Sequence, residues 1–156
     1  MGELWCAGDF LFTGYWNDPE ATRRAIVDGW FRTGDQVVRD CEGRYRIVGR
    51  IGFMIKRGGI FVSPLEVEAA LVDHPAVAEC VAAGMQSDKW GQEVEAFVVL
   101  RRTASAADLH AFAAEALGEP SRPVRFWSVA GIPRTSLGKI ARGEIKELRA
   151  SARLLT

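Results

Sequence analysis

A glycine-rich break, GRIG at residues 49–52, divides this chain into two parts with different patterns. Two glycines in four residues let the backbone rotate there at low steric cost. Residues 3–12 mix aromatic and aliphatic residues as strands do, and a short helix opens at 17–20. The turn at 40–43 separates two apparent strands and predicts a hairpin. We therefore expect a β-rich part at 1–48, a hinge at 49–52 and a separate domain at 53–156.

The part after the break predicts a small α+β domain in which helices flank a three-stranded sheet. Two glycines after its first strand, Gly58 and Gly59, indicate a tight turn. The sheet is expected to consist of strands at 76–85, 93–101 and 124–129; a further short strand is expected at 53–57, and helices at 64–73, 105–117 and 141–155.

The helix at 64–73 has the clearest start signal in the chain. Ser63 is suited to cap it and Pro64 to fill its first position. Its apolar spacing predicts that Leu65, Ala69 and Val72 are buried.

The two later helices also have recognisable patterns. Ser105 and Asp108 predict a capping box for the first of them. The final helix is expected to place Ile145, Leu148 and Ala152 on one stripe, with its basic residues on the other.

Charge and cysteine content exclude several classes of protein. Lys plus Arg equals Asp plus Glu at 20 each, so the overall charge does not favour nucleic acid or an anionic membrane as a partner. The segment 134–153 is locally basic, which fits either a solvated helix face or an anionic partner. Three widely spaced cysteines, Cys6, Cys41 and Cys80, predict neither a disulfide framework nor a zinc site. No membrane span or signal segment is apparent, and we expect a cytoplasmic protein.

General motifs for phosphate binding and hydrolysis are missing. Gly138 and Lys139 resemble the end of a phosphate-binding P-loop, but Pro133 and Ile140 occupy positions where that loop needs Gly and Ser or Thr. No dinucleotide-binding glycine motif, nucleophile elbow or paired metal ligand is present.

Four segments in one order carry a family resemblance: GELWCAG at 2–8, WFRTGD at 30–35, GRIGFMIKRGG at 49–59 and PRTSLGK at 133–139. Together they resemble the C-terminal third of the AMP-forming adenylating enzymes, which include acyl- and aryl-CoA ligases, peptide-synthetase adenylation domains and luciferases. The resemblance implies that residues 1–48 end a large N-terminal domain and that 53–156 form a mobile lid. It also implies a fragment that is inactive without the missing N-terminal domain.

The resemblance assigns three residues to the nucleotide and the first chemical step. Asp35 would accept hydrogen bonds from the ribose hydroxyls of ATP, and Arg50 would face the ribose and help lock the two domains together. Lys139 would bridge the attacking carboxylate and the α-phosphate as a point charge. Taken alone, Asp35 is a turn residue, Arg50 a solvated residue and Lys139 a solvent-facing lysine.

The resemblance assigns a second group of residues to CoA. Gly58 and Gly59 would approach the pantetheine arm after the lid rotates about the hinge, and Trp90 and Arg122 match positions that contact CoA in some aryl-CoA ligases. Without the resemblance, Trp90 could belong to the core and Arg122 to the solvated surface. Gly52 stands where the family commonly has Asp or Lys, which eases rotation and removes a charge.

The activity implied is that of an ATP-dependent acyl- or aryl-CoA ligase. A carboxylic acid and ATP give acyl-AMP and pyrophosphate, and CoA then gives the thioester and AMP. Mg²⁺ is expected with ATP, with its ligands outside these residues, and no metal site is expected within them. The alternatives are an adenylation domain that serves a carrier protein and a non-catalytic, lid-like binding module.

Overall fold

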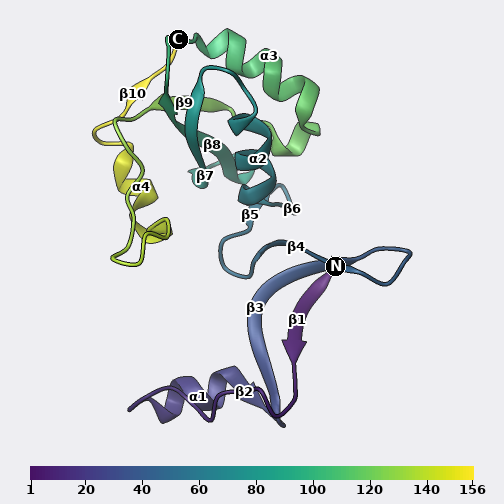
Figure 1. The fold of residues 1–156 in the computed structure, drawn as a ribbon. Coiled ribbons are helices and arrows are strands. Elements are labelled where there is room, and N and C mark those ends of the chain that lie inside the picture. Colours follow the sequence, from purple (N-terminus) through teal and green to yellow (C-terminus); the bar gives the residue numbers. More distant parts are fainter. The chain divides into compact units, whose positions relative to one another are not determined.

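A computed structural model describes residues 1–156, which divide into two compact units, Met1–Gly52 and Phe53–Thr156 (Figure 1). The first unit is built around one long strand, β3, which pairs antiparallel with each of the other three strands. Its elements are β1 (Gly2–Cys6), α1 (Pro19–Ala25), β2 (Ile26–Val27), β3 (Trp30–Arg39) and β4 (Tyr45–Arg50).

Two local predictions for the first unit are confirmed. The Asp18 side chain accepts a hydrogen bond from the Ala21 amide at 2.8 Å and caps α1. β3 and β4 form the expected hairpin, and Gly43 in its turn has φ of +85°, which glycine adopts without steric cost.

The second unit contains a six-stranded sheet of order β10-β9-β8-β5-β6, in which β7 also pairs with β8. β8 is central because it runs antiparallel to β7 and parallel to β9. The elements are β5 (Ile55–Arg57), β6 (Ile60–Val62), α2 (Pro64–Val72), β7 (Val77–Ser87), β8 (Gly91–Leu100), α3 (Ala106–Ala116), η1 (Glu119–Ser121), β9 (Arg125–Ser128), η2 (Arg142–Glu144), α4 (Ile145–Leu148) and β10 (Arg153–Leu154).

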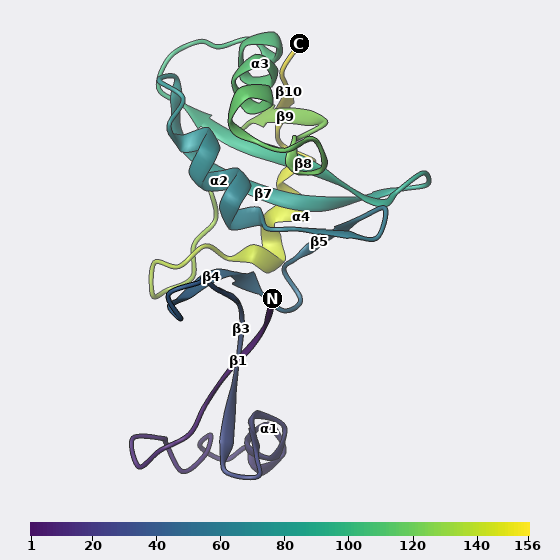
Figure 2. The same cartoon turned by 90° about the vertical axis from the view of Figure 1, so that its right-hand side faces the viewer.

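Helices cover both faces of this sheet (Figure 2). On one face, α2 and α3 pack against the larger apolar cluster, to which β8 contributes Val94, Ala96 and Val98. On the other face, Ile145 of α4 packs with Phe97 of β8. This division follows from the alternation of side chains along a strand.

The α+β class is confirmed, but the sheet has six strands where the sequence predicts three. β7, β8 and β9 correspond to the three expected long strands. The Gly58-Gly59 turn folds β5 and β6 into a hairpin that joins β8 through the pairing of Arg57 with Gly91. β10 joins β9 at the other end.

The predicted buried face of α2 is wrong. Leu65 and Val72 are each 42% exposed, whereas Val67 and Leu71 are fully buried. The helix is rotated because it also buries Glu68, whose carboxylate has partners on β7 and on the segment before α4. A prediction from hydrophobic spacing places Glu68 on the solvent side of the helix, and it therefore selects the wrong buried face for α2.

The predicted helix at 141–155 is also wrong, since α4 ends at Leu148. Beyond it, β10 pairs with β9, the Leu155 amide donates to the Phe126 carbonyl at 2.9 Å, and the Leu155 side chain is buried. The predicted apolar stripe of Ile145, Leu148 and Ala152 does pack on the sheet. Strand pairing with a distant segment therefore replaces the last turns of the helix.

α3 begins with the capping box that the sequence predicts. Ser105 Oγ accepts from the Asp108 amide at 3.1 Å, and the Asp108 carboxylate accepts from the Ser105 amide at 3.1 Å. The Ser105 hydroxyl also donates to this carboxylate and is the first cause that lowers the pKa of Asp108. No helix in the chain combines the length and apolar content needed to cross a membrane.

All three cysteines are free thiols. Cys41 is exposed, Cys6 is half-buried and Cys80 is buried in β7. Burial, and secondarily the negative charge of Glu68, raises the pKa of Cys80. This thiol is therefore neutral in the folded chain.

Candidate functional site

Lys139 ends a small hairpin loop that its own sequence specifies. The Gly138 amide donates to the Thr135 carbonyl at 2.9 Å, and the Thr135 amide donates to the Lys139 carbonyl at 2.7 Å. Gly138 has φ of +78°, the left-handed conformation that such a three-residue loop needs at its last position. Arg134 and Ile140 pair just outside the loop. The PRTSLGK segment is thus a structured turn.

The Lys139 side chain is exposed and makes neither a hydrogen bond nor an ion pair. Ile140 beside it packs against the cluster that contains Ile145 of α4. Because neighbouring side chains point to opposite sides of an extended segment, anchoring Ile140 turns Lys139 toward solvent. The loop presents an ammonium group on a fixed backbone.

Arginine–carboxylate pairs lie on both sides of this loop. On the N-terminal side, Arg134 forms an ion pair with Glu79 of β7 and donates to the Gly138 carbonyl at 3.1 Å. On the C-terminal side, both terminal nitrogens of Arg142 bind the two oxygens of Glu68, at 2.9 and 2.7 Å. The second pair is the more buried, with side chains only 17% and 11% exposed.

Half of the six basic residues in segment 134–153 are therefore compensated locally. Three of its arginines face acidic residues from outside the segment, and the pairs are Arg134–Glu79, Arg142–Glu68 and Arg149–Glu95. Glu95 is fully buried in β8 and also accepts from Arg125 at 2.8 Å and from the Trp127 indole at 2.6 Å. Neither a wholly solvated helix face nor an open cationic surface describes this region.

Asp35 and Arg50 are neighbours in the first unit. They occupy paired positions on β3 and β4, and Arg50 Nε lies 3.0 Å from Asp35 Oδ1. Arg50 also donates to the Thr33 carbonyl at 2.7 Å. The Asp35 side chain is 28% exposed, and its second oxygen makes no hydrogen bond. The geometry leaves one carboxylate oxygen available to an external donor.

The stretch of β3 just before Asp35, where its register with β1 shifts, is held by hydrogen bonds to β1. Thr33 Oγ1 donates to the Leu4 carbonyl at 2.8 Å, and the Gly34 amide donates to Glu3 at 3.2 Å. A hydrogen bond from the Trp5 side chain, followed by Arg32, lowers the pKa of Glu3. Glu3 thus stays ionised and fixes this stretch of β3, which is part of a strand and not the turn that the sequence alone suggests.

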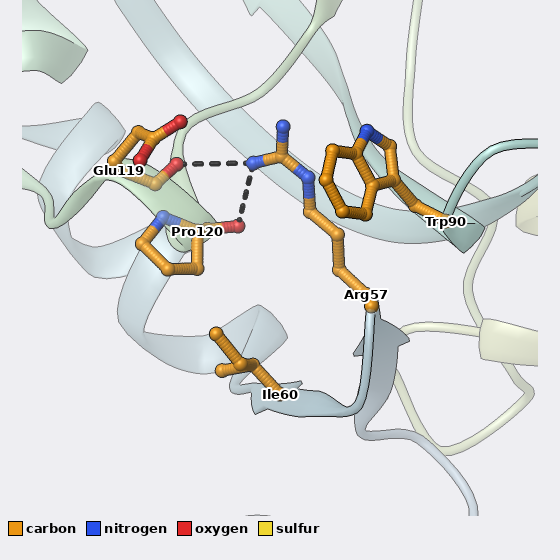
Figure 3. A pocket seen from close by; sticks show the side chains of 6 residues that line it. Arg57, Ile60, Trp90, Glu119 and Pro120 are labelled. Carbon is orange, nitrogen blue, oxygen red and sulfur yellow. Dashed lines mark hydrogen bonds between the residues drawn. The ribbon is translucent and has the colours of Figure 1, made fainter.

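Gly58 and Trp90 line one pocket of about 120 Å³ in the second unit. The Gly58 amide donates to the Trp90 carbonyl at 2.8 Å, and a Cβ on Gly58 would lie 2.8 Å from the Trp90 ring. Arg57 crosses the pocket beside this ring and donates to the carbonyls of Glu119 and Pro120 at 3.0 and 3.1 Å (Figure 3). Trp90 is 40% exposed, so it is a wall of the pocket and not part of the core.

Arg122 does not line this pocket. Its Nε donates to the Leu117 carbonyl at 3.0 Å and one Nη donates to the Ala114 carbonyl at 2.8 Å, so it caps the C-terminal end of α3. Gly59 has φ of +87° with open space around it. Gly52 has φ of +91°, also in open space, and is the last residue of the first unit.

Sequence reasoning missed several residues of the Gly58–Trp90 pocket and of the surroundings of the lysine loop. Arg57, Glu119 and Pro120 line the pocket, and Glu68 and Arg142 hold the lysine loop. Only Glu68 left a signal, as a second glutamate within the SPLEVE helix start. The structure gathers no group of three or more His, Cys, Asp or Glu side chains that could hold a metal ion.

Comparison with known proteins places the chain in a family. Residues 66–139 match the family described as the C-terminal domain of AMP-binding enzymes. The chain is 39% identical to a 2-succinylbenzoate–CoA ligase of Bacillus velezensis over 95% of its own length and 30% of the relative's. It is 40% identical to a medium/long-chain-fatty-acid–CoA ligase of Mycobacterium tuberculosis over 89% of its own length and 26% of the relative's.

A solved structure agrees with these matches. The o-succinylbenzoate CoA synthetase of Bacillus subtilis, in complex with its acyl-adenylate intermediate, superposes with a TM-score of 0.92 at 32% identity. The match covers 99% of this chain and 31% of that enzyme. The chain thus spans about a third of the length of the proteins it matches. It belongs to the AMP-forming adenylating enzymes, whose C-terminal domain it carries.

Proposed function

We propose that this chain supplies the lid and hinge of an ATP-dependent acyl- or aryl-CoA ligase. The observation that carries the proposal is Lys139, an unpaired and exposed ammonium group on a loop braced on both sides. The relatives named above are CoA ligases, which favours CoA over a carrier protein as the acceptor. They act on different acids, so the proposal names the reaction and not the acid.

In the first step a carboxylate oxygen of the acid attacks the α-phosphorus of ATP. A new C–O–P linkage forms while the bond from the α-phosphorus to the bridging oxygen breaks, and pyrophosphate leaves. Two anions must approach each other, and negative charge gathers on the phosphoryl oxygens. Lys139 would offset this charge with an ammonium group that makes no competing ion pair within the chain.

Asp35 and Arg50 would bind the sugar of the same nucleotide. Asp35 Oδ1 is held by Arg50, which leaves Oδ2 to accept from a ribose hydroxyl. Arg50 also donates to the Thr33 carbonyl, so the pair is oriented before any ligand arrives. This preorganisation favours the bound geometry.

In the second step the thiol of CoA attacks the acyl carbonyl and AMP leaves. The pocket between Gly58 and Trp90 would guide the CoA arm, because the glycine lets backbone and indole approach closely. Arg122 would contribute indirectly, by capping the helix end that precedes Glu119 and Pro120. Gly52 would be the pivot about which the second unit rotates between the two steps, presenting first the lysine loop and then the Gly58–Trp90 pocket. Its φ of +91° is a conformation that only glycine adopts freely.

The test measures both steps in a chimera in which this chain replaces the matching 31% of the Bacillus subtilis enzyme. Lys139→Ala should lower pyrophosphate exchange by roughly 10²–10³-fold, the usual cost of losing one preorganised charge donor. Thioester formation from supplied acyl-adenylate and CoA should stay close to the parent rate. Lys146→Ala, an exposed lysine of the same basic segment, serves as the matched control.

Two results would contradict the proposal. One is a parent chimera that catalyses neither step. The other is a Lys139→Ala variant that loses both steps equally, because that pattern indicates structural damage.

A further inference from the structure

We propose that Glu68 and Arg142 form a positioning pair that sets the orientation of Lys139 for adenylation. The inference rests on the proposed function of Lys139. It assigns a role to two residues that never need to touch the nucleotide. Their effect would pass through the backbone that carries Lys139.

Arg142 lies close to the lysine loop in sequence, and its partner Glu68 comes from a distant helix. Arg142 follows Lys139 by three residues, and the Ala141 amide between them donates to the Pro133 carbonyl at 2.9 Å. Glu68 is carried by α2, 74 residues away from Arg142 in the chain. The pair therefore ties the C-terminal side of the lysine loop to the helix layer.

Hydrogen bonds hold both oxygens of the Glu68 carboxylate in place. Oε1 accepts from the Ala82 amide of β7 at 2.9 Å and from Arg142 Nη1 at 2.9 Å, while Oε2 accepts from Arg142 Nη2 at 2.7 Å. A planar guanidinium that binds both oxygens fixes direction as well as distance. Lysine carries the same charge without this fork and cannot reproduce the geometry.

Arg142 has a further neighbour at the start of the second unit. Its guanidinium lies 6.0 Å from the ring of Phe53, the residue that follows Gly52. On the other side of the loop, Arg134 binds Glu79 and the Gly138 carbonyl. The lysine loop is thus braced at both ends, and the Glu68–Arg142 brace is the buried one.

The experiment uses the same chimera and measures the two steps separately. Glu68→Gln puts an amide in place of one carboxylate oxygen that Arg142 donates to, and Arg142→Lys keeps the charge while removing the fork. Each should lower the kcat of adenylation by roughly 10–10²-fold, since a displacement of about 1 Å costs up to that much. The KM for ATP and the rate of thioester formation should change little.

Glu66→Gln is the matched control, because Glu66 lies on the same helix and its side chain is exposed. Equal loss of both steps in Glu68→Gln and Arg142→Lys would show a general structural role and overturn the inference. Unchanged adenylation in both variants would also overturn it. If Lys139→Ala itself spares adenylation, the proposed function fails instead, so the two failures are distinguishable.

Discussion

The lysine loop and the Gly58–Trp90 pocket lie in the same unit but are built in opposite ways. The loop presents the exposed Lys139 ammonium group without partners, and its order comes from backbone hydrogen bonds and from ion pairs on either side. The pocket is a concave surface whose lining residues bind one another, since Arg57 donates to the carbonyls of Glu119 and Pro120. A side chain that offers its charge to a ligand needs a fixed backbone and a free terminal group. A pocket that guides a ligand needs walls that are held in place by their own contacts.

The largest effect should come from removing the buried brace of the loop. Arg142→Met leaves the Glu68 carboxylate buried without its counter-charge, which typically costs about 3–5 kcal/mol. We expect the urea midpoint of the second unit to fall accordingly, measured by circular dichroism on the 156-residue chain. Hydrogen exchange should localise the loss to α2, β7 and the loop.

Arg134→Met provides the contrast for this measurement. Its ion pair with Glu79 is half-exposed, with side chains 47% and 43% exposed, and such pairs contribute about 1 kcal/mol or less. Equal destabilisation by the two variants would mean that burial does not distinguish the two braces.

A smaller effect should come from the wall of the pocket. Gly58→Ala forces a residue with a Cβ into φ of +55° and places that atom 2.8 Å from the Trp90 ring. The backbone conformation alone costs about 1–2 kcal/mol for a non-glycine residue, and the clash adds to it. Thioester formation in the chimera should fall more than adenylation.

Gly59→Ala separates strain from contact. Gly59 has φ of +87° but open space around it, so its substitution carries the backbone cost without the clash. If Gly59→Ala is as damaging as Gly58→Ala in both stability and thioester formation, close approach to Trp90 is not what shapes the pocket.

The smallest effect should come from the cap of α3, the helix that precedes the pocket residues Glu119 and Pro120. Ser105→Ala removes the N-cap hydroxyl, at a cost of about 1 kcal/mol. The same hydroxyl lowers the pKa of Asp108 in the folded chain. The ionised carboxylate therefore stabilises the wild-type fold at pH values above the pKa of Asp108 in the unfolded chain. This stabilisation is lost as the pH falls through the lower pKa of the folded chain.

Acid titration of the free energy of unfolding tests this cap. The wild-type chain should lose stability below about pH 4, whereas Ser105→Ala should show a flatter curve there. Identical curves for the two proteins would show that the cap does not hold the carboxylate in its ionised form.

The sequence predicts those parts of the fold that local chemistry decides. The helix start at 17–20, the capping box at Ser105 and the turn at 40–43 depend on residues within a few positions, and all three are confirmed. The buried face of α2 depends on Glu68 meeting Arg142, and the end of α4 depends on Leu155 meeting Phe126. No local pattern carries that information.

The same distinction holds for the candidate site. Lys139, Asp35 and Gly58 stand in recognisable segments, so a resemblance can name them. The direct pairing of Asp35 with Arg50 and the closure of the pocket by Glu119 and Pro120 come from tertiary structure. The sequence places Arg142 on the basic stripe of the predicted final helix and cannot identify Glu68 as its partner, because Glu68 lies on another element.

The Glu68 carboxylate also has a consequence for self-association. β7 pairs only with β8, so the amide and carbonyl groups of its outer edge have no strand partner. The Ala82 amide, in the middle of that edge, is already bound to Glu68, and Arg142 lies behind it. An incoming strand would have to break a buried ion pair before it could add to the sheet, which protects the chain against edge-to-edge aggregation.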